Sequence, residues 1–304
     1  MKGTGSVKKL DILRTNIAAW LFLIPFLVFY VGFLLFPILR GFYISLFDSS
    51  LIGQDVFVGL KNYATMLTDK SFWESLFNTM FFVIISTPVI VIAGFILANF
   101  INAKLKGTTF LRASFFSSYV LSMSVVTGLW VFIYQPYTGL ISKLMAEMGA
   151  VEQIFWLDTK WLVWIAVLIT TTWWTVGFDM ILFLAGLQNI PEEIYEAAQI
   201  DGASRMQTIF RITIPMLKET TVLIILLQSI SSFKLFGQTY LMSRGGPGTH
   251  SRTLVHYIYE TGFINKQMGL ASAMSVAFFV VVLLFSFLQK RVFADNQTRK
   301  RPAK

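Results

Sequence analysis

Six long apolar stretches constrain this chain more than any other feature of its sequence. Each is long enough to cross about 30 Å of hydrocarbon, for which a helix needs about 20 residues. We expect these spans at 17–39, 79–101, 115–134, 161–187, 221–241 and 268–289. Since 55% of the residues are hydrophobic and only 13% are charged, the chain has too much clustered apolar surface for a soluble domain. The sequence therefore predicts an all-α integral membrane protein with one transmembrane domain over residues 1–304.

The first stretch has one feature of a signal peptide, because basic residues precede an apolar run. It is longer than a typical signal core, is interrupted by Pro25 and Pro37, and has no small-x-small cleavage site before the next polar segment. We therefore expect it to remain as the first span. The chain has no cysteine, which excludes disulfides and thiolate metal sites.

The distribution of Lys and Arg predicts the orientation, because cationic loops are retained on the cytoplasmic side. Roughly two-thirds of the 25 basic residues fall on the face that holds both termini. They are Lys2, Lys8, Lys9, Arg14, Lys104, Lys106, Arg112, Arg205, Arg211, Lys218, Lys290, Arg291, Arg299, Lys300, Arg301 and Lys304. Both termini are therefore expected in the cytoplasm. The net charge of +9 is attributed to anchoring at anionic lipid headgroups, and no nucleic-acid partner is expected.

The cytoplasmic loop over residues 188–215 is long and mixed in charge. Pro191 is suited to the start of a helix, and Glu192 and Glu193 complement the positive end of its dipole. Gly202 is expected to end this helix in a left-handed conformation. Ser204 and Gln207 have the spacing of a capping box, which predicts a second short helix. Two short helices at an angle would suit docking of a soluble partner, although an amphipathic hairpin on the membrane surface is the alternative.

The loop resembles the EAA loop of ABC importer permeases. The resemblance is carried by Glu196, Ala197, Ala198, Asp201, Gly202, Ala203, Phe210, Ile214 and Pro215. It implies a coupling helix that sits in a cleft of an ATP-binding subunit. Glu196 is then expected to pair with a basic residue of that subunit, Ala197 and Ala198 to permit close approach, and Gly202 to make the turn.

A second resemblance, to sugar-type permeases of the maltose and glycerol-3-phosphate importer group, covers residues 20–293. It is carried by residues 184–192, by the Gly-Gly-Pro-Gly run at 245–248 and by residues 257–260. It implies a six-helix permease subunit of an ATP-driven, binding-protein-dependent importer for a carbohydrate, forming half of the translocation pathway in the bacterial or archaeal cytoplasmic (inner) membrane. The implied partners are a second permease subunit, two ATP-binding subunits and an extracellular or periplasmic solute-binding protein.

The sequence contains no phosphate-binding loop of the G-x-x-x-x-G-K-[ST] type. We therefore expect a non-catalytic subunit that binds no cofactor, with ATP and magnesium bound by the partner ATPase. His250 and His256 are interpreted as ordinary polar residues rather than as a metal pair, since they are too few for a zinc site. The alternative function is a secondary transporter or channel for a small polar solute, for which the docking loop has no use.

Polar residues within the spans predict the solute pathway, because such groups normally face protein or a water-filled cavity. The candidates are Trp173, Trp174 and Asp179 in the fourth span and Gln228, Ser231, Ser232, Lys234 and Gln238 in the fifth. Phe178 is a further aromatic candidate, for stacking or packing. Two interpretations of Lys234 stay open: it pairs with Asp179, or it faces the solute cavity and attracts an acidic solute.

Overall fold

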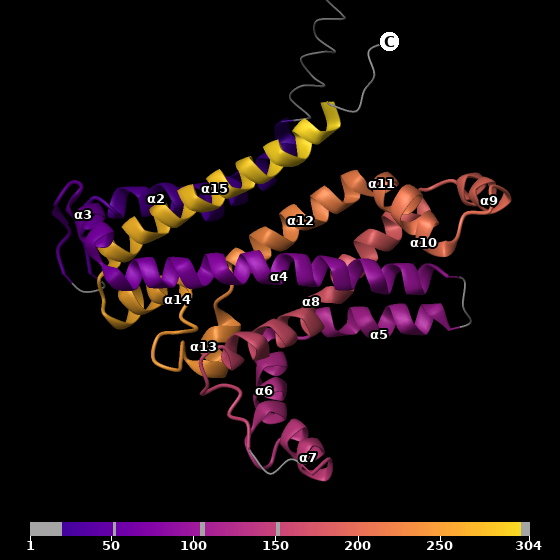
Figure 1. Ribbon diagram of the computed structural model, residues 1–304. Coiled ribbons are helices and arrows are strands. Elements are labelled where there is room, and N and C mark those ends of the chain that lie inside the picture. The colour runs from indigo at the N-terminus through magenta and orange to yellow at the C-terminus, as the bar shows by residue number, and fades with distance from the viewer. Residues whose placement is uncertain (1–19, 51–52, 104–106, 150–152, 299–304) are drawn as a thin grey trace, which may run out of the picture. The chain divides into compact units, whose positions relative to one another are not determined.

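The computed structural model describes residues 20–50, 53–103, 107–149 and 153–298, which are mostly helical (Figure 1). Four of the described helices are long and apolar enough to cross a membrane, and two further helix pairs pass the same test together although each pair is bent. Counting each bent pair as one span gives six. The predicted all-α membrane fold is therefore confirmed. The chain divides into two compact units, Met1–Thr68 with Thr261–Ala277 and Asp69–Glu260 with Phe278–Lys304.

The first unit contains the helix Trp20–Ile44, which includes the π-helical turn η1 (Val31–Leu35) and α2 (Phe36–Ile44). A two-residue hairpin ladder follows, with β1 (Phe47–Asp48) antiparallel to β2 (Val56–Phe57), and then α3 (Lys61–Thr68). The Asn62 side chain donates to the carbonyl oxygens of Ser45 and Phe47, at 2.9 and 2.8 Å. These bonds fix the chain where the first helix ends.

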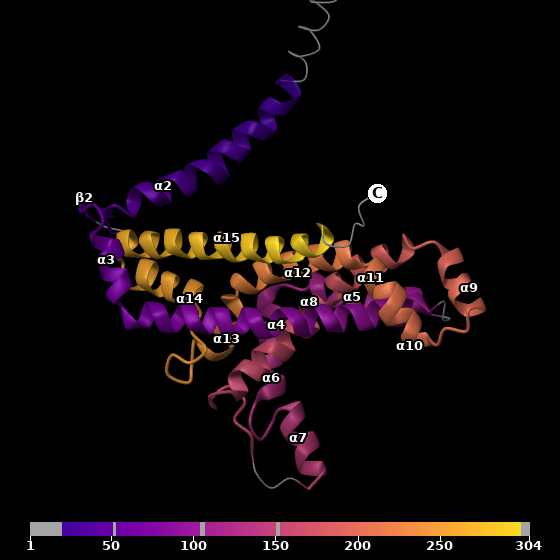
Figure 2. The same ribbon diagram turned by 45° about the horizontal axis from the view of Figure 1, so that its top comes forward.

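The second unit contains the other spans, except for the first part of the last one, and the loop over residues 188–215. Its elements are α4 (Lys70–Asn102), α5 (Thr108–Val120), α6 (Met123–Tyr134), α7 (Leu140–Glu147), α8 (Leu162–Gln188), α9 (Glu192–Ile200), α10 (Arg205–Thr208), η2 (Ile209–Thr213), α11 (Ile214–Met216), α12 (Lys218–Phe233), α13 (Gly237–Ser243) and α14 (Leu254–Tyr259). The π-helical η3 (Glu260–Ile264) and α15 (Met268–Thr298) each have residues in both units. Figures 1 and 2 show α4 and α5 alongside α8, and α9 beyond the ends of these helices.

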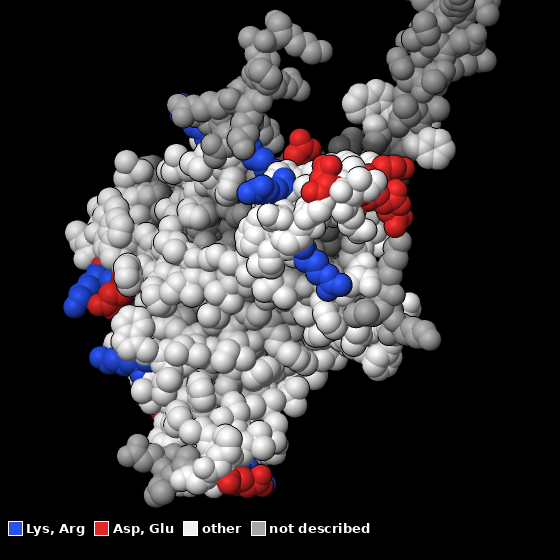
Figure 3. Space-filling model, turned by 45° about the vertical axis from the view of Figure 1, so that its right-hand side comes forward, with Lys and Arg blue, Asp and Glu red and all other residues white. Residues whose placement is uncertain are grey.

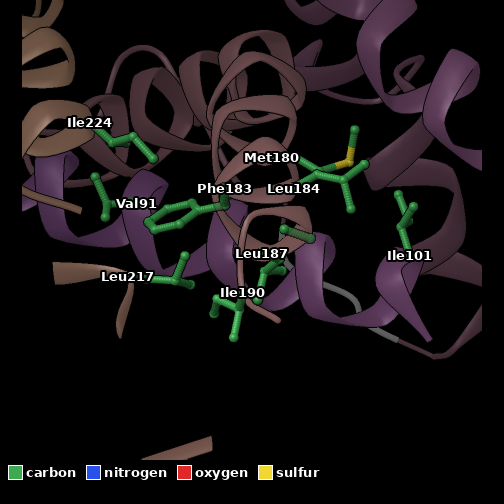
Figure 4. Packing of buried hydrophobic residues seen from close by; sticks show 10 residues of the cluster. Val91, Ile101, Met180, Phe183, Leu184, Leu187, Ile190, Leu217 and Ile224 are labelled. Atoms are coloured by element: carbon green, nitrogen blue, oxygen red, sulfur yellow. The ribbon is translucent and has the colours of Figure 1, made fainter. Parts of the chain in front are cut away.

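Small residues allow α8 to pack closely against both neighbours. A Cβ at Gly177 would lie 2.1 Å from the Phe115 carbonyl oxygen of α5, and a Cβ at Gly94 of α4 would lie 2.8 Å from the Asp179 Cβ. Such contacts are typical of helices in membranes, where small residues let backbones approach. Around them lies an apolar cluster of α4, α8 and α12 residues that includes Val91, Met180 and Ile224 (Figure 4).

Two of the expected spans are broken. The axes of α5 and α6 differ by 100°, with Leu121 and Ser122 extended between them, and α12 and α13 differ by 45°. The predicted spans over 115–134 and 221–241 are therefore wrong as single continuous helices. Pro88, by contrast, lies inside α4 without ending it.

The other predicted ends agree more closely with the structure. The fourth span was predicted at 161–187 and is observed as Leu162–Gln188. The sixth span, α15, begins at Met268 as predicted. The helix α4 begins at Lys70 rather than at residue 79, because Asp69 caps it by accepting the Ser71 N–H at 2.9 Å. The first helix continues to Ile44 rather than ending at residue 39, and residues 17–19 of the predicted span lie outside the described ranges.

Candidate functional site

The loop over residues 188–215 contains the two predicted helices. Helix α9 begins at Glu192, directly after Pro191, and has Glu192 and Glu193 in its first turn. It ends at Ile200, and Gly202 then has a φ of +74°. The Ala203 N–H donates to the Ala198 carbonyl oxygen at 2.9 Å, which closes the turn. The sequence therefore identified both ends of this helix.

Helix α10 begins with the predicted capping box. The Ser204 N–H donates to Gln207 Oε1 at 2.8 Å, and the Gln207 N–H donates to Ser204 Oγ at 3.4 Å. The chain then continues through η2 and α11 to Leu217, directly before α12. Pro215 lies in the first turn of α11, where its missing N–H is tolerated.

The first half of α9 packs against residues at the ends of the membrane helices. Leu187 and Ile190, at the end of α8, and Leu217, before α12, belong to one buried cluster, against which Ile194 and Tyr195 pack (Figure 4). Tyr195 Oη also lies 3.3 Å from Thr213 Oγ1 of η2. Because α9 shares this core with α8 and α12, a movement of α9 would be transmitted to both.

The outer surface of the loop is apolar at several points. Ile200, Met206 and Phe210 are 86%, 62% and 61% exposed. Between the short helices lies a groove of about 430 Å³, whose lining residues include Ala197, Ala198, Asp201, Gly202, Ala203 and Arg211. Figure 3 shows acidic and basic side chains at the upper, left and lower edges of a broad uncharged surface. Of the remaining candidates, Glu196 and Pro215 are exposed.

A second candidate site is a cavity of about 330 Å³ among the membrane helices. It is lined by residues of α4, α5, α8, α12 and α13 and of the break between α12 and α13. These are Phe82, Tyr119, Thr171, Trp174, Thr175, Gln228, Ser231, Ser232, Leu235 and Gln238. Five of them, Trp174, Gln228, Ser231, Ser232 and Gln238, are predicted pathway residues. Tyr119, Thr171 and Thr175 were not predicted as pathway residues. Their polar groups within apolar stretches could have indicated them.

Polar side chains in the cavity wall are held by hydrogen bonds. Gln228 Nε2 donates to Ser232 Oγ at 3.4 Å, and Ser86 Oγ of α4 donates to the same oxygen at 3.0 Å. Gln228 is only 5% exposed. Ser232 Oγ therefore accepts both from Gln228 of its own helix and from Ser86 of α4.

The aromatic candidates differ in their positions. Trp174 lines the cavity, and its Nε1 donates to the Leu121 carbonyl oxygen at 3.2 Å, at the break between α5 and α6. Phe178 stacks on Tyr119 with a centroid separation of 5.0 Å. Trp173 does not line the cavity and packs edge-on against Trp130 at 5.9 Å.

Asp179 and Lys234 are not brought together. Asp179 is 1% exposed and packs against Gly94 of α4, and its Oδ2 has no hydrogen-bond partner. Lys234 is exposed at the break between α12 and α13. Among the described residues no ion pair joins the two, so pairing within this chain is not supported, and neither residue lines the cavity.

The two histidines also lie apart from the cavity. His250 is exposed, with Nδ1 3.1 Å from the Pro247 carbonyl oxygen. His256 is 1% exposed, and its Nε2 lies 3.3 Å from Glu260 Oε1, while Arg252 contacts the other carboxylate oxygen at 3.3 Å. Within the described ranges no cluster of three or more His, Cys, Asp or Glu residues has the arrangement of a metal site.

The fold and these sites define a polytopic helical membrane protein, with a polar cavity among its spans and a segment of short helices packed against the ends of α8 and α12. The chain belongs to the family of binding-protein-dependent transport system inner membrane components, which matches residues 56–295. It is therefore a permease subunit and an integral inner-membrane protein. This confirms the resemblance to ABC importer permeases.

Individual relatives match nearly the whole chain. A probable ABC transporter permease, YurN of Bacillus subtilis, is 35% identical over 289 residues, covering 93% of this chain and 98% of that protein. The trehalose/maltose transport system permease MalF of Thermococcus litoralis is 34% identical over 277 residues, covering 90% and 92%. A chain from the crystal structure of a bacterial ABC transporter involved in import of the acidic polysaccharide alginate shares the fold, with a TM-score of 0.84, 22% identity and coverage of 95% and 99%.

Proposed function

We propose that this chain forms half of the translocation pathway of an ATP-driven importer for a carbohydrate, such as an oligosaccharide or a related polyol. The cavity carries the proposal. Its hydroxyl and amide groups match the hydrogen-bonding hydroxyls of a sugar, and Trp174 and Tyr119 offer aromatic surfaces for its C–H faces. Several relatives are named for the transport of this solute class, including trehalose/maltose and arabinooligosaccharides.

Coupling to ATP hydrolysis is assigned to α9 and α10. The exposed apolar side chains of this segment suit the surface of a partner protein, and the core that α9 shares with α8 and α12 connects the segment to those helices. In this proposal Glu196 pairs with a basic residue of an ATP-binding subunit, and Ala197, Ala198 and Ala203 allow close approach. ATP and magnesium are bound by that subunit. A second permease, a second ATP-binding subunit and an external solute-binding protein complete the assembly.

A secondary transporter or channel is the alternative, and the two functions differ in their need for an ATPase. Purification of the membrane complex through a tag on this chain tests this difference. The importer predicts an ATPase that is retained with the parent chain and reduced by Glu196→Lys, which reverses the charge, or by Gly202→Val, which strains a residue at φ +74°.

Gln199→Ala is the matched control, since Gln199 is exposed on the same helix and lies outside the resembling motif. Retention of the ATPase by both variants, together with parental transport, would remove α9 as the docking element. Mass spectrometry of small molecules retained by the purified complex then identifies the solute.

The proposed orientation places both termini in the cytoplasm. The chain has no cysteine, so single cysteines can be labelled with an impermeant thiol reagent. Exposed sites suited to this are Lys143 and Thr249 on the proposed external side and Arg205 on the cytoplasmic side. Labelling of intact cells at Lys143→Cys and Thr249→Cys, but not at Arg205→Cys, is expected, and the reverse pattern would invert the topology.

A further inference from the structure

One face of α12 is exposed along its length and is not purely apolar. Leu223 and Leu227 are 51% and 39% exposed, and Ser231 and Lys234 continue the same face towards the break. At about 100° per residue these positions fall on one side of the helix. The opposite side is buried, and its residues include Ile224, Gln228, Ser229, Ser232 and Phe233.

Other exposed faces in the same unit have a different composition. On α4, the exposed residues between positions 81 and 98 are all apolar, and they include Ile84, Ile92 and Ile96. On α15, the exposed residues between positions 278 and 288 are also all apolar, and they include Leu284 and Phe287. These two faces suit lipid, whereas a face that carries Ser231 and Lys234 suits protein or water.

In the proposed orientation, with α12 starting at the cytoplasmic surface, Lys234 lies within the thickness of the membrane, towards its external side. It directly follows the 16-residue α12, which places it about 24 Å along the helix from the cytoplasmic end, at about 1.5 Å per residue. The hydrocarbon is about 30 Å thick. A cation at this depth is costly unless it is hydrated or paired.

This chain offers Lys234 no anion among its described residues. No ion pair that involves Lys234 is formed, and Asp179 packs against α4 instead. The apolar helix Trp20–Ile44 contains no Asp or Glu, so it has no acidic group to offer.

Lys234 is also at the edge of the cavity rather than inside it. Ser231, one helical turn before Lys234, and Leu235, directly after it, line the cavity, whereas Lys234 does not. The lining contains no Lys, Arg, Asp or Glu. The lysine therefore lies at the edge of the cavity, on the exposed side of the break between α12 and α13.

We propose that Lys234 pairs with a carboxylate of the second permease subunit, within the membrane at the edge of the pathway. This inference rests on the proposed function, in which a second permease supplies the other half. The Lys234 ammonium would donate to the carboxylate oxygens of the second permease. This ion pair would hold the segment between α12 and α13 in contact with that subunit. Lys234 would recognise the second permease through a buried, charge-assisted hydrogen bond.

Retention of the second permease by the tagged complex tests this pairing. Lys234→Gln and Lys234→Glu are expected to reduce retention in dilute detergent, with an affinity loss of about tenfold or more, because removing one partner of a buried charge pair leaves the other unpaired. Lys234→Arg should retain the partner. Lys143→Gln is the control, since it removes an exposed lysine on α7.

A photoactivatable crosslinker attached at Lys234→Cys gives a readout independent of stability. A crosslinked peptide of the second permease with an Asp or Glu near the attachment point supports the pair. Crosslinking to lipid alone would overturn it in favour of a lysine that reaches the headgroups. Parental retention of the partner by Lys234→Gln, with altered transport of anionic solutes only, would overturn it in favour of solute contact. Failure of the parent chain itself to retain any second permease would instead contradict the proposed function.

Discussion

Gly94 of α4 lies directly against Asp179 of α8, so closely that a Cβ at position 94 would be 2.8 Å from the Asp179 Cβ. The same Cβ would lie 3.3 Å from the Asp179 carbonyl carbon and from the Met180 nitrogen. Two of these atoms belong to the α8 backbone and cannot rotate away. The absence of a side chain at position 94 therefore allows the close approach of α4 and α8.

Gly94→Ala is expected to lower stability by about 1–3 kcal/mol, as overpacking in a tight core does. The apparent melting temperature of the detergent-purified protein, followed by size-exclusion chromatography, measures this. Gly128→Ala is the matched control, because nothing lies within 4 Å of a Cβ at this exposed glycine of α6. Alanine has the higher helix propensity, so the control should be neutral or slightly stabilising. Equal effects of the two changes would contradict close packing at Gly94.

Asp179→Asn and Lys234→Gln are expected to have additive effects on stability. Asp179 packs against α4, Lys234 is exposed at the break in the fifth span, and they share no described partner. Independent sites usually add to within about 0.5 kcal/mol. A double-mutant cycle on melting of the purified protein measures the coupling. A coupling well above that limit would restore the intrachain pair that the structure does not support.

The sequence predicted α9 well because its ends depend on local chemistry. Pro191 and the acidic first turn mark its start, and Gly202 marks its end, and each acts on backbone groups within a few residues. The capping box of Ser204 and Gln207 is local for the same reason. The ends of α8 were also close to prediction, because hydropathy alone determines a long apolar run.

The breaks were not predicted because their causes are tertiary. Nothing in the dipeptide Leu121-Ser122 excludes a helix, and the Leu121 carbonyl is satisfied by Trp174 Nε1, 53 residues further along the chain. At the second break, the Leu235 carbonyl accepts from Thr253 Oγ1 at 2.7 Å. Pro88 is the converse case, since α4 continues through it. The cavity residues Tyr119 and Thr171 were missed because only the folded chain brings them beside α12.

Gln228→Leu is expected to reduce transport while leaving assembly intact. The substitution removes the amide from the cavity wall, and Ser86 and Ser232 keep their mutual hydrogen bond. Gln289→Leu is the control, because Gln289 Nε2 of α15 donates to Ser229 Oγ of α12 at 3.1 Å and Gln289 does not line the cavity. Uptake by the reconstituted complex, normalised to complex content, separates the two. Parental uptake by Gln228→Leu would exclude the amide from solute contact.

Ser204→Ala is expected to weaken the docking segment. It removes the acceptor for the Gln207 N–H, and loss of such a cap costs about 1 kcal/mol. We expect faster hydrogen exchange over α10, measured by mass spectrometry on the purified complex. Ser204→Asp, which keeps an acceptor, should exchange like the parent. Equal protection in the alanine variant would show that the cap does not hold the helix.

The last prediction concerns acid stability and His256. Burial lowers the pKa of this imidazole below its ordinary value, and Arg252 acts in the same direction, whereas Glu260 raises the pKa. The structural reason is clear at Nδ1, which is buried without a hydrogen-bond partner. A proton added there would occupy a site that no acceptor serves, while Nε2 faces Glu260.

Because the folded pKa is lowered, the contribution of His256 to stability is fully present above the unfolded pKa of about 6.5. It is lost as the pH falls from there towards the folded pKa, since the unfolded chain binds the proton first. The melting temperature of the parent should therefore decline over this interval more steeply than that of His256→Gln. His250→Gln, at the exposed histidine, should follow the parent. If His256→Gln declines as steeply as the parent, the acid sensitivity arises elsewhere in the protein.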